Sequence, residues 1–195
     1  MLIVTGHLGP YELGGAWAAA LGYPVHAMVE DLDPDVLDAL GTYRQATGMR
    51  LISMKQGLRG VYRLLQEQQI VLLVADRAIG EGAERGSVDV PFCDGVRSIP
   101  TGPATFAIAT GAPIVVGHIA LNPARTPRYL VEFDPPLVPR GRGDDERLRL
   151  TRVIADRLAA AVRDHPDEWY VFQPQWIPSD RDQSGAEGGA HQRTS

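Results

Sequence analysis

Short apolar runs alternate with amphipathic segments along most of this chain. Runs typical of buried strands cover residues 2–6, 25–29, 50–54, 70–75 and 113–121. Segments with helical periodicity or helix-start signals cover residues 10–22, 34–48, 57–68, 101–110 and 146–165. Two further segments, 88–92 and 128–133, have the composition or alternation of strands. Strands that alternate with helices predict an α/β fold with a central, mostly parallel sheet flanked by helices.

The composition of single runs and the residues at their ends support this assignment of strands and helices. The run at 70–75 is apolar without interruption, which is typical of a central parallel strand buried on both faces. Asp33 and Pro34 are typical of a helix start, and Gly48 of a helix end. No internal repeat or second domain is visible, so we expect one domain over residues 1–178. The remainder, 179–195, is poor in apolar residues and is predicted to be disordered.

Composition and charge exclude several classes of function. The chain has 195 residues and a formal net charge of −5, so it lacks the basic surplus of a nucleic-acid-binding protein. Its single cysteine, Cys93, excludes an internal disulfide and a multi-cysteine zinc site. No apolar run approaches the roughly 20 residues of a membrane-spanning helix. A domain that begins on a core strand at residue 2 is unusual, and we therefore expect further sequence upstream of Met1.

The first candidate for chemistry is His7 with Glu12. His7 lies in a tight turn after the first strand, and Glu12 lies in the first turn of the following helix, where a negative charge is favoured. Because of the turn, Glu12 can fold back towards the imidazole and orient it, which leaves the other ring nitrogen to accept a proton. The alternative is a solvated loop histidine beside a capping glutamate.

A second candidate, Asp76-Arg77, follows the buried run 70–75. Ligands of open α/β sheets bind beyond the carboxyl ends of the strands, so this pair and His7 can face one crevice. The alternatives are an internal salt bridge and, for Arg77, a phosphate site. In the segment 95–104, Thr101 is expected to cap the next helix and Pro103 to start it, so that the helix N-terminus would suit an anion.

Other chemistries lack their motifs. There is no Gly-x-Ser-x-Gly nucleophile elbow, no Walker or Rossmann glycine pattern, and no partner that would activate Cys93. His7, Glu12 and His118 match no known metal-site spacing, so no metal is predicted. His26 and His165 are expected at the surface or at helix ends. The tryptophans are expected in the core or its rim, or at a membrane interface in the case of Trp169 and Trp176.

Taken together, these residues resemble the bacterial lipid A biosynthesis acyltransferase family, and most closely its branch of phosphatidylinositol mannoside acyltransferases. The resemblance covers residues 1 to about 178 in the order of the family's motifs. The matching blocks are His7-x4-Glu12, Tyr43-Arg44 before Gly48-Met49, Asp76-Arg77, 88–92, 100–104, 110–113, His165-Pro166-x-x-Trp169 and Gln173-x-x-Trp176. Family members carry a further N-terminal helical segment that helps to dock on the membrane, and we expect the 195-residue sequence to lack this segment. The branch also has a second Asp after Asp-Arg, where this chain has Ala78.

The resemblance implies a glycerol-phosphate-acyltransferase-like fold and transfer of a fatty acyl group from a thioester to a sugar hydroxyl. His7 would be the general base and Glu12 would orient it. Arg44, Arg77 or backbone N–H groups would stabilise the oxyanion, and Glu81 would accept hydrogen bonds from sugar hydroxyls. Together with Asp76, these residues form the predicted substrate site. An apolar groove for the acyl chain is expected near the helix 10–22.

The implied partners are an acyl donor, either acyl-CoA or acyl carrier protein, and a glycolipid acceptor such as a mannose of phosphatidylinositol mannoside. No cofactor is implied, since acyl-CoA is a co-substrate. The implied location is peripheral, at the cytoplasmic face of the cell membrane. Two alternatives stay open: an acyltransferase for another acceptor, such as a lipid A precursor or a glycerol phosphate, and a non-catalytic lipid-binding paralogue.

Overall fold

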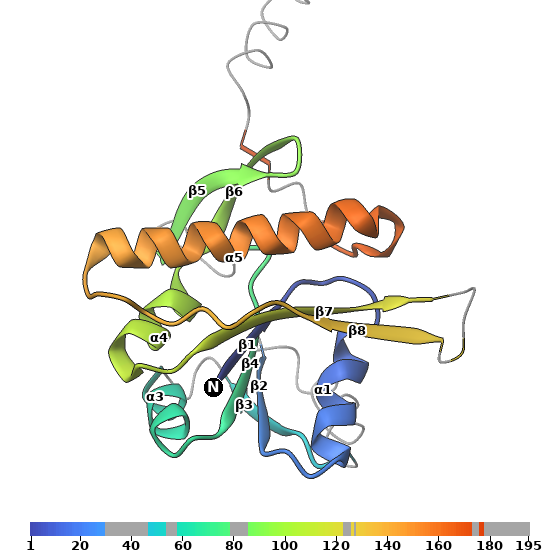
Figure 1. Ribbon diagram of the computed structural model, residues 1–195, viewed down its shortest axis with the longest axis horizontal. Coiled ribbons are helices and arrows are strands. Elements are labelled where there is room, and N and C mark those ends of the chain that lie inside the picture. The colour runs from blue at the N-terminus through green and yellow to red at the C-terminus, as the bar shows by residue number, and fades with distance from the viewer. Residues whose placement is uncertain are drawn as a thin grey trace, which may run out of the picture.

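A six-stranded mixed sheet forms the centre of the molecule (Figure 1). The computed structural model describes residues 1–29, 47–53, 58–78, 86–122, 126, 128–172 and 176–177. The sheet strands are β1 (Leu2–Thr5), β2 (Val25–Val29), β3 (Arg50–Ser53), β4 (Ile70–Val74), β7 (Ile114–Leu121) and β8 (Tyr129–Phe133). They lie in the order β3-β2-β4-β1-β7-β8, and every neighbouring pair is parallel except β7 and β8. The predicted α/β class with a mostly parallel sheet is confirmed.

Helices cover both faces of this sheet. They are α1 (Tyr11–Ala20), α3 (Leu58–Gln66), α4 (Gly102–Thr110) and α5 (Asp144–Asp164), and a short 3-10 turn, η3, follows over Pro166–Glu168. The side chains of β1 alternate, as in any strand: Leu2 and Val4 join the core under α3, α4 and α5, while Ile3 packs on the side of α1 (Figure 1). The central strands are therefore apolar on both faces, which explains their uninterrupted apolar sequence.

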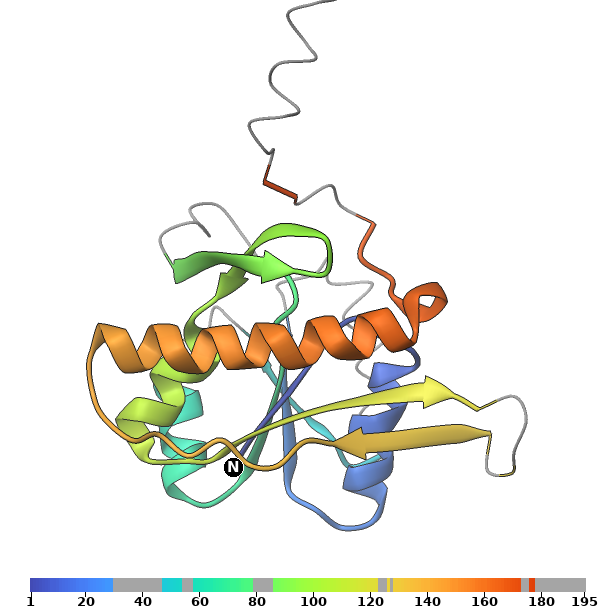
Figure 2. The ribbon, with the colours of Figure 1, turned by 45° about the horizontal axis from the view of Figure 1, so that its top comes forward.

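A separate antiparallel hairpin lies on the outer side of α5. Its strands are β5 (Ser87–Phe92) and β6 (Gly95–Pro100), and Figure 2 shows α5 between this hairpin and the sheet. The strand β6 was not predicted from the sequence, because the segment 95–104 was interpreted only as the start of the next helix. The reason is Arg97, which occupies an inward position beside the buried Ile99 and so disguises the strand's alternation.

The predicted element boundaries need small corrections. Pro10 is the N-cap of α1 rather than its first residue. Thr101 does occupy the N-cap of α4, but its hydroxyl donates a hydrogen bond to the Gly86 carbonyl at 3.0 Å and does not cap the helix. His26 is buried on β2, so its predicted surface location is wrong. Most of the predicted helix 34–48 and the predicted disordered tail from residue 179 lie outside the described residues.

Candidate active site

The register between β1 and β4 brings His7 and Asp76 together. Thr5 pairs with Val74 across these parallel strands, and the Ala75 N–H donates to the Thr5 carbonyl at 2.9 Å. The next residues, Gly6-His7 and Asp76, therefore leave the sheet side by side. A methyl group at Gly6 would lie 3.1 Å from an Asp76 carboxylate oxygen, so the absence of a side chain there allows the two turns to approach closely.

Asp76 is a fully buried carboxylate whose two oxygens both accept hydrogen bonds. Oδ1 accepts from His7 Nδ1 at 2.6 Å. Oδ2 accepts from the His7 backbone N–H at 2.8 Å and from the Trp169 indole at 2.9 Å. The side chain is 0% exposed, so it lies behind the imidazole and out of reach of solvent.

This bonding pattern determines the charge of Asp76 and the orientation of His7. Burial on its own would raise the pKa of Asp76, but the hydrogen bonds and charge of His7 and the Trp169 indole outweigh it and hold that pKa below its usual value. An ionised carboxylate only accepts hydrogen bonds, so Nδ1 of His7 carries a proton. The Nε2 lone pair of a neutral His7 is then available as a base.

The segment after α5 packs directly on the turn that carries His7. The Tyr170 N–H donates to the His7 carbonyl, and the Gly9 N–H donates to the Glu168 carbonyl, both at 2.8 Å. Gly9 has a φ of +55°, and a Cβ there would collide with the backbone carbonyl of Ile119. The turn therefore requires glycine at this position, and the same contacts place the Trp169 indole over Asp76.

Arg97 supports the indole from behind. It is 1% exposed, and its guanidinium carbon lies 5.0 Å from the Trp169 ring centroid, 4.8 Å from that of Trp176 and 5.8 Å from that of Phe92. Burial lowers the pKa of Arg97, and the negative charge of Asp76 acts against this shift. The cation and the three rings form one packed layer that positions Trp169.

An apolar hollow lies between α1 and the sheet, and Tyr11 connects it with His7. The Tyr11 ring contacts the His7 ring edge-on, with centroids 5.3 Å apart, and also lines the hollow. Most of the other lining residues are small or apolar, and Thr5 and His118 are polar members of the lining. The small or apolar residues include Ile3, Gly14, Gly15, Trp17, Ala18, Leu72, Ile119, Val131 and Phe133. Its volume is about 60 Å³, so it holds only part of a long apolar ligand.

Comparison with known proteins assigns the chain to a family. The family model described as bacterial lipid A biosynthesis acyltransferase matches residues 1–177. The chain belongs to the bacterial lipid A biosynthesis acyltransferase family. The phosphatidylinositol mannoside acyltransferase of Mycolicibacterium smegmatis is 28% identical over 189 residues, which are 94% of this chain and 59% of that protein. A protein of the same name from Mycobacterium tuberculosis H37Rv is 28% identical over 176 residues, or 88% of this chain and 52% of that protein. The chain thus spans between half and three fifths of these relatives' length.

The predicted site residues of this family member fall into three groups. His7 and Asp76 are in direct contact. Arg77 follows Asp76 and is half-buried, and Glu12 is half-buried in the first turn of α1. Arg44 and Glu81 lie outside the described residues.

One of these assignments changes with the structure. Asp76 was expected to contact substrate, but its complete burial and its three hydrogen bonds turn the carboxylate towards His7 instead. The carboxylate seen on the His7 ring is thus Asp76. The corresponding role of Glu12 stays a prediction.

Two residues of the site were not identified as site residues from the sequence. Trp169 was assigned only to the core, its rim or a membrane interface, although it ends the His165-Pro166-x-x-Trp169 motif. Arg97 lies in the segment 95–104, to which only a helix start and an anion site were assigned, and it is buried. The motif was therefore a signal for Trp169 alone, and the sequence contained no information about which partners either residue contacts.

The metal-ligating groups cluster elsewhere. Within the described residues, the three groups that approach one another are His118, Glu132 and His165, not the triplet of His7, Glu12 and His118 considered from the sequence. In the part of the chain that the structure describes, no helix has both the length and the apolar character needed to cross a bilayer.

Proposed function

We propose that this family member transfers a fatty acyl group from acyl-CoA to a hydroxyl of a membrane glycolipid, with a mannose of phosphatidylinositol mannoside as the acceptor. The observation that carries the proposal is the His7–Asp76 pair. A buried carboxylate holds Nδ1 at 2.6 Å at the carboxyl ends of two parallel strands, and the His7 ring contacts Tyr11, which lines an apolar hollow. This arrangement resembles the histidine–carboxylate pair with which hydrolases activate a hydroxyl nucleophile.

In the proposed reaction, Nε2 of His7 accepts the proton of the acceptor hydroxyl while its oxygen attacks the thioester carbonyl carbon. The carbonyl becomes a tetrahedral oxyanion, and the imidazole becomes an imidazolium whose positive charge is stabilised by Asp76. When the intermediate collapses, the C–S bond breaks and the CoA sulfur takes the proton from Nε2. The products are an ester and free CoA, and no acyl-enzyme is formed.

The developing oxyanion needs a hydrogen-bond donor, which typically contributes several kcal/mol. Among the residues that the structure describes, Arg77 is a candidate for this donor because it directly follows Asp76 in the turn beside His7. Arg44 and the backbone N–H groups near the His7 turn remain candidates as predicted. Glu81 is proposed to bind acceptor hydroxyls, and Glu12 is proposed as a second carboxylate that acts on His7.

The acyl chain is proposed to enter the hollow under α1. Its lining is almost entirely apolar, and Tyr11 connects it with the His7 ring. Gly14 and Gly15 leave space on the α1 side that larger residues would fill. A chain seated here would present its thioester carbonyl beside His7, and its length beyond the hollow would require the lining side chains to move apart.

The proposed acceptor is supported by the names of the two mycobacterial relatives, each 28% identical to this chain.

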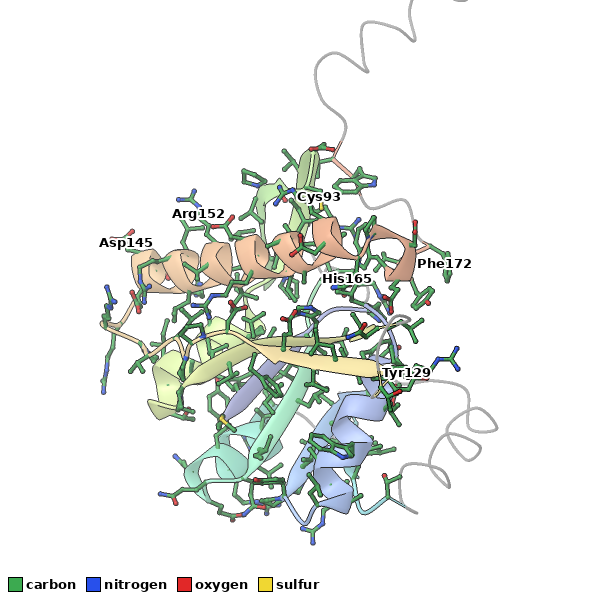
Figure 3. The ribbon with its side chains drawn as sticks, turned by 45° about the vertical axis from the view of Figure 1, so that its right-hand side comes forward. Cys93, Tyr129, Asp145, Arg152, His165 and Phe172 are labelled. Atoms are coloured by element: carbon green, nitrogen blue, oxygen red, sulfur yellow. The ribbon has the colours of Figure 1, made fainter. Side chains whose placement is uncertain are left out.

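The proposed peripheral attachment to the membrane is supported by a group of exposed apolar side chains. Exposed aromatic and aliphatic side chains follow η3: Tyr170, Phe172, Trp176 and Ile177. Phe172 is 85% exposed and projects from the body of the molecule (Figure 3). Such rings suit the interface of a bilayer, and we place this surface on the cytoplasmic face of the membrane, where acyl-CoA is available.

The test is transfer of labelled palmitoyl from palmitoyl-CoA to phosphatidylinositol mannoside in detergent micelles. Wild type, His7→Gln and the matched variant His191→Gln are compared, both as the 195-residue chain and within any longer reading frame that contains it. We expect transfer by wild type and His191→Gln and its loss in His7→Gln, with unchanged circular dichroism. Transfer to a lipid A precursor or a glycerol phosphate alone would overturn the acceptor. No transfer to any of these lipids, with lipid binding retained, would support a non-catalytic lipid-binding protein.

A further inference from the structure

Two histidines and a glutamate from three separate elements converge beside β7, and one of them, His118, also lines the apolar hollow. His118 on β7 pairs in register with Glu132 on β8, and His165 follows the last residue of α5. Their ligating atoms all lie within 4.8 Å of one another. Figure 3 shows His165 between the end of α5 and the β7–β8 strands. Neither the proposed acyl transfer nor the core packing uses these three groups together.

His118 is in a state that suits a ligand. Its Nε2 is buried and makes no hydrogen bond within the described residues, although it lies 3.2 Å from Oε2 of Glu132. A buried nitrogen in this situation normally finds a donor or acceptor.

The spacing of the three groups fits a small tetrahedral ion. Ligands about 2.0 Å from zinc at tetrahedral angles are roughly 3.3 Å apart. The separation between His118 and Glu132 already has this value, and the widest separation must shrink by a side-chain adjustment of His165 or Glu132. Glu132 is 53% exposed on an edge strand, so it has the freedom to move.

We propose that His118, Glu132 and His165 form a binding site for Zn²⁺ or a similar divalent transition metal. Two imidazoles and one carboxylate are a frequent zinc ligand set, with a fourth position left for water. His118 and Glu132 line a hollow of about 410 Å³ between β8 and α5, whose lining also includes Asp134, Asp156 and Asp164 with Arg157. The excess of carboxylates attracts cations to this hollow.

A second layer of contacts connects the site with the His7 turn. Oε1 of Glu168 lies 3.7 Å from Nδ1 of His165, close enough for its negative charge to act on that ring. The Glu168 carboxylate also accepts from the Leu121 N–H at 3.0 Å, and its carbonyl accepts from Gly9. A bound ion would therefore tie β7, β8 and α5 together and hold the segment that carries Trp169.

The test measures zinc binding by the untagged, chelator-treated full chain, by calorimetry and by metal analysis after dialysis. Glu132→Gln and His165→Gln are compared with Glu67→Gln, a control of similar exposure (56%), and with His191→Gln. We expect wild type and both controls to bind zinc at one tight site and to show a higher Tm with zinc. The affinity should be at least about tenfold weaker in Glu132→Gln and His165→Gln. Cobalt should give the visible absorption of a tetrahedral ion in wild type and lose it in these variants.

Two results would overturn the proposal. One is the absence of tight zinc binding by the correctly folded wild type, which would leave the cluster as an ion-pair network. The other is equal affinity in wild type, Glu132→Gln and His165→Gln, which would mean adventitious binding elsewhere. Both results are independent of acyl transfer, because the readouts are affinity, spectrum and Tm.

Discussion

Replacement of Asp76 by asparagine tests whether this carboxylate selects the active form of His7. Asparagine has the same shape, but one oxygen becomes an NH₂ donor. Oδ2 accepts from two donors, the His7 backbone N–H and the Trp169 indole, so the amide oxygen must take its place. The NH₂ group then faces Nδ1 of His7, which must become an acceptor. The ring proton moves to Nε2, and the base is lost.

The magnitude follows from this change of tautomer. A histidine base held in the wrong tautomer by an Asp→Asn change loses about 10⁴ in kcat in a serine protease, or roughly 5.5 kcal/mol of transition-state stabilisation. We expect a loss of about 10³–10⁴ in kcat for Asp76→Asn with little change in KM. The charge-assisted hydrogen bonds also weaken, which should lower the free energy of unfolding by about 1–3 kcal/mol.

The assay is steady-state acyl transfer with unfolding in urea measured in parallel. Glu12→Gln is the matched comparison, because it neutralises the carboxylate that the sequence pairs with His7. The reasoning is refuted if folded Asp76→Asn keeps kcat within about tenfold of wild type, well short of the loss expected from the wrong tautomer. A large loss in Glu12→Gln with little loss in Asp76→Asn would return the orienting role to Glu12.

Three further predictions concern the surroundings of this pair. Gly9→Ala should lower the free energy of unfolding by more than the roughly 1–2 kcal/mol of a strained φ, because the new Cβ meets the Ile119 carbonyl. Gly22→Ala is the control, since Gly22 has a φ of +88° and no atom near its missing Cβ, so that urea unfolding of this variant should show the cost of the strain alone. Arg97→Lys should cost about 2 kcal/mol and alter Trp fluorescence, since lysine keeps the charge but not the planar stacking; an unchanged midpoint would contradict the packed layer. The pKa of Asp76 is lower in the folded chain, so its stabilisation is complete above its ordinary pKa of about 4 and is lost as pH falls through the folded value. Unfolding free energy should therefore fall less steeply with acid in Asp76→Asn, and equal slopes would contradict the shift.

Much of the fold was predictable because it depends on local patterns. The run 70–75 was identified as a central strand since burial on both faces requires an uninterrupted apolar sequence, and β4 covers Ile70–Val74. The helix 57–68 was identified from its apolar stripe, and α3 covers Leu58–Gln66. The strand β6 was missed because Arg97, a charged residue, occupies an inward position where the alternation of a strand predicts an apolar one. Its guanidinium is accommodated there by the rings of Trp169 and Trp176, which are distant in sequence.

The candidate site shows the same division. The sequence by itself determined that His7 and Asp76 each leave the carboxyl end of a buried strand, because apolar runs and the residues after them can be read locally. Only the tertiary structure decided that they form a pair, since strand order and register join residues 69 apart. It also decided that Trp169, 93 residues beyond Asp76, completes the hydrogen bonds of the buried carboxylate. Such partners depend on long-range packing and on the need to satisfy a buried charge, and neither leaves a periodic signal in the sequence.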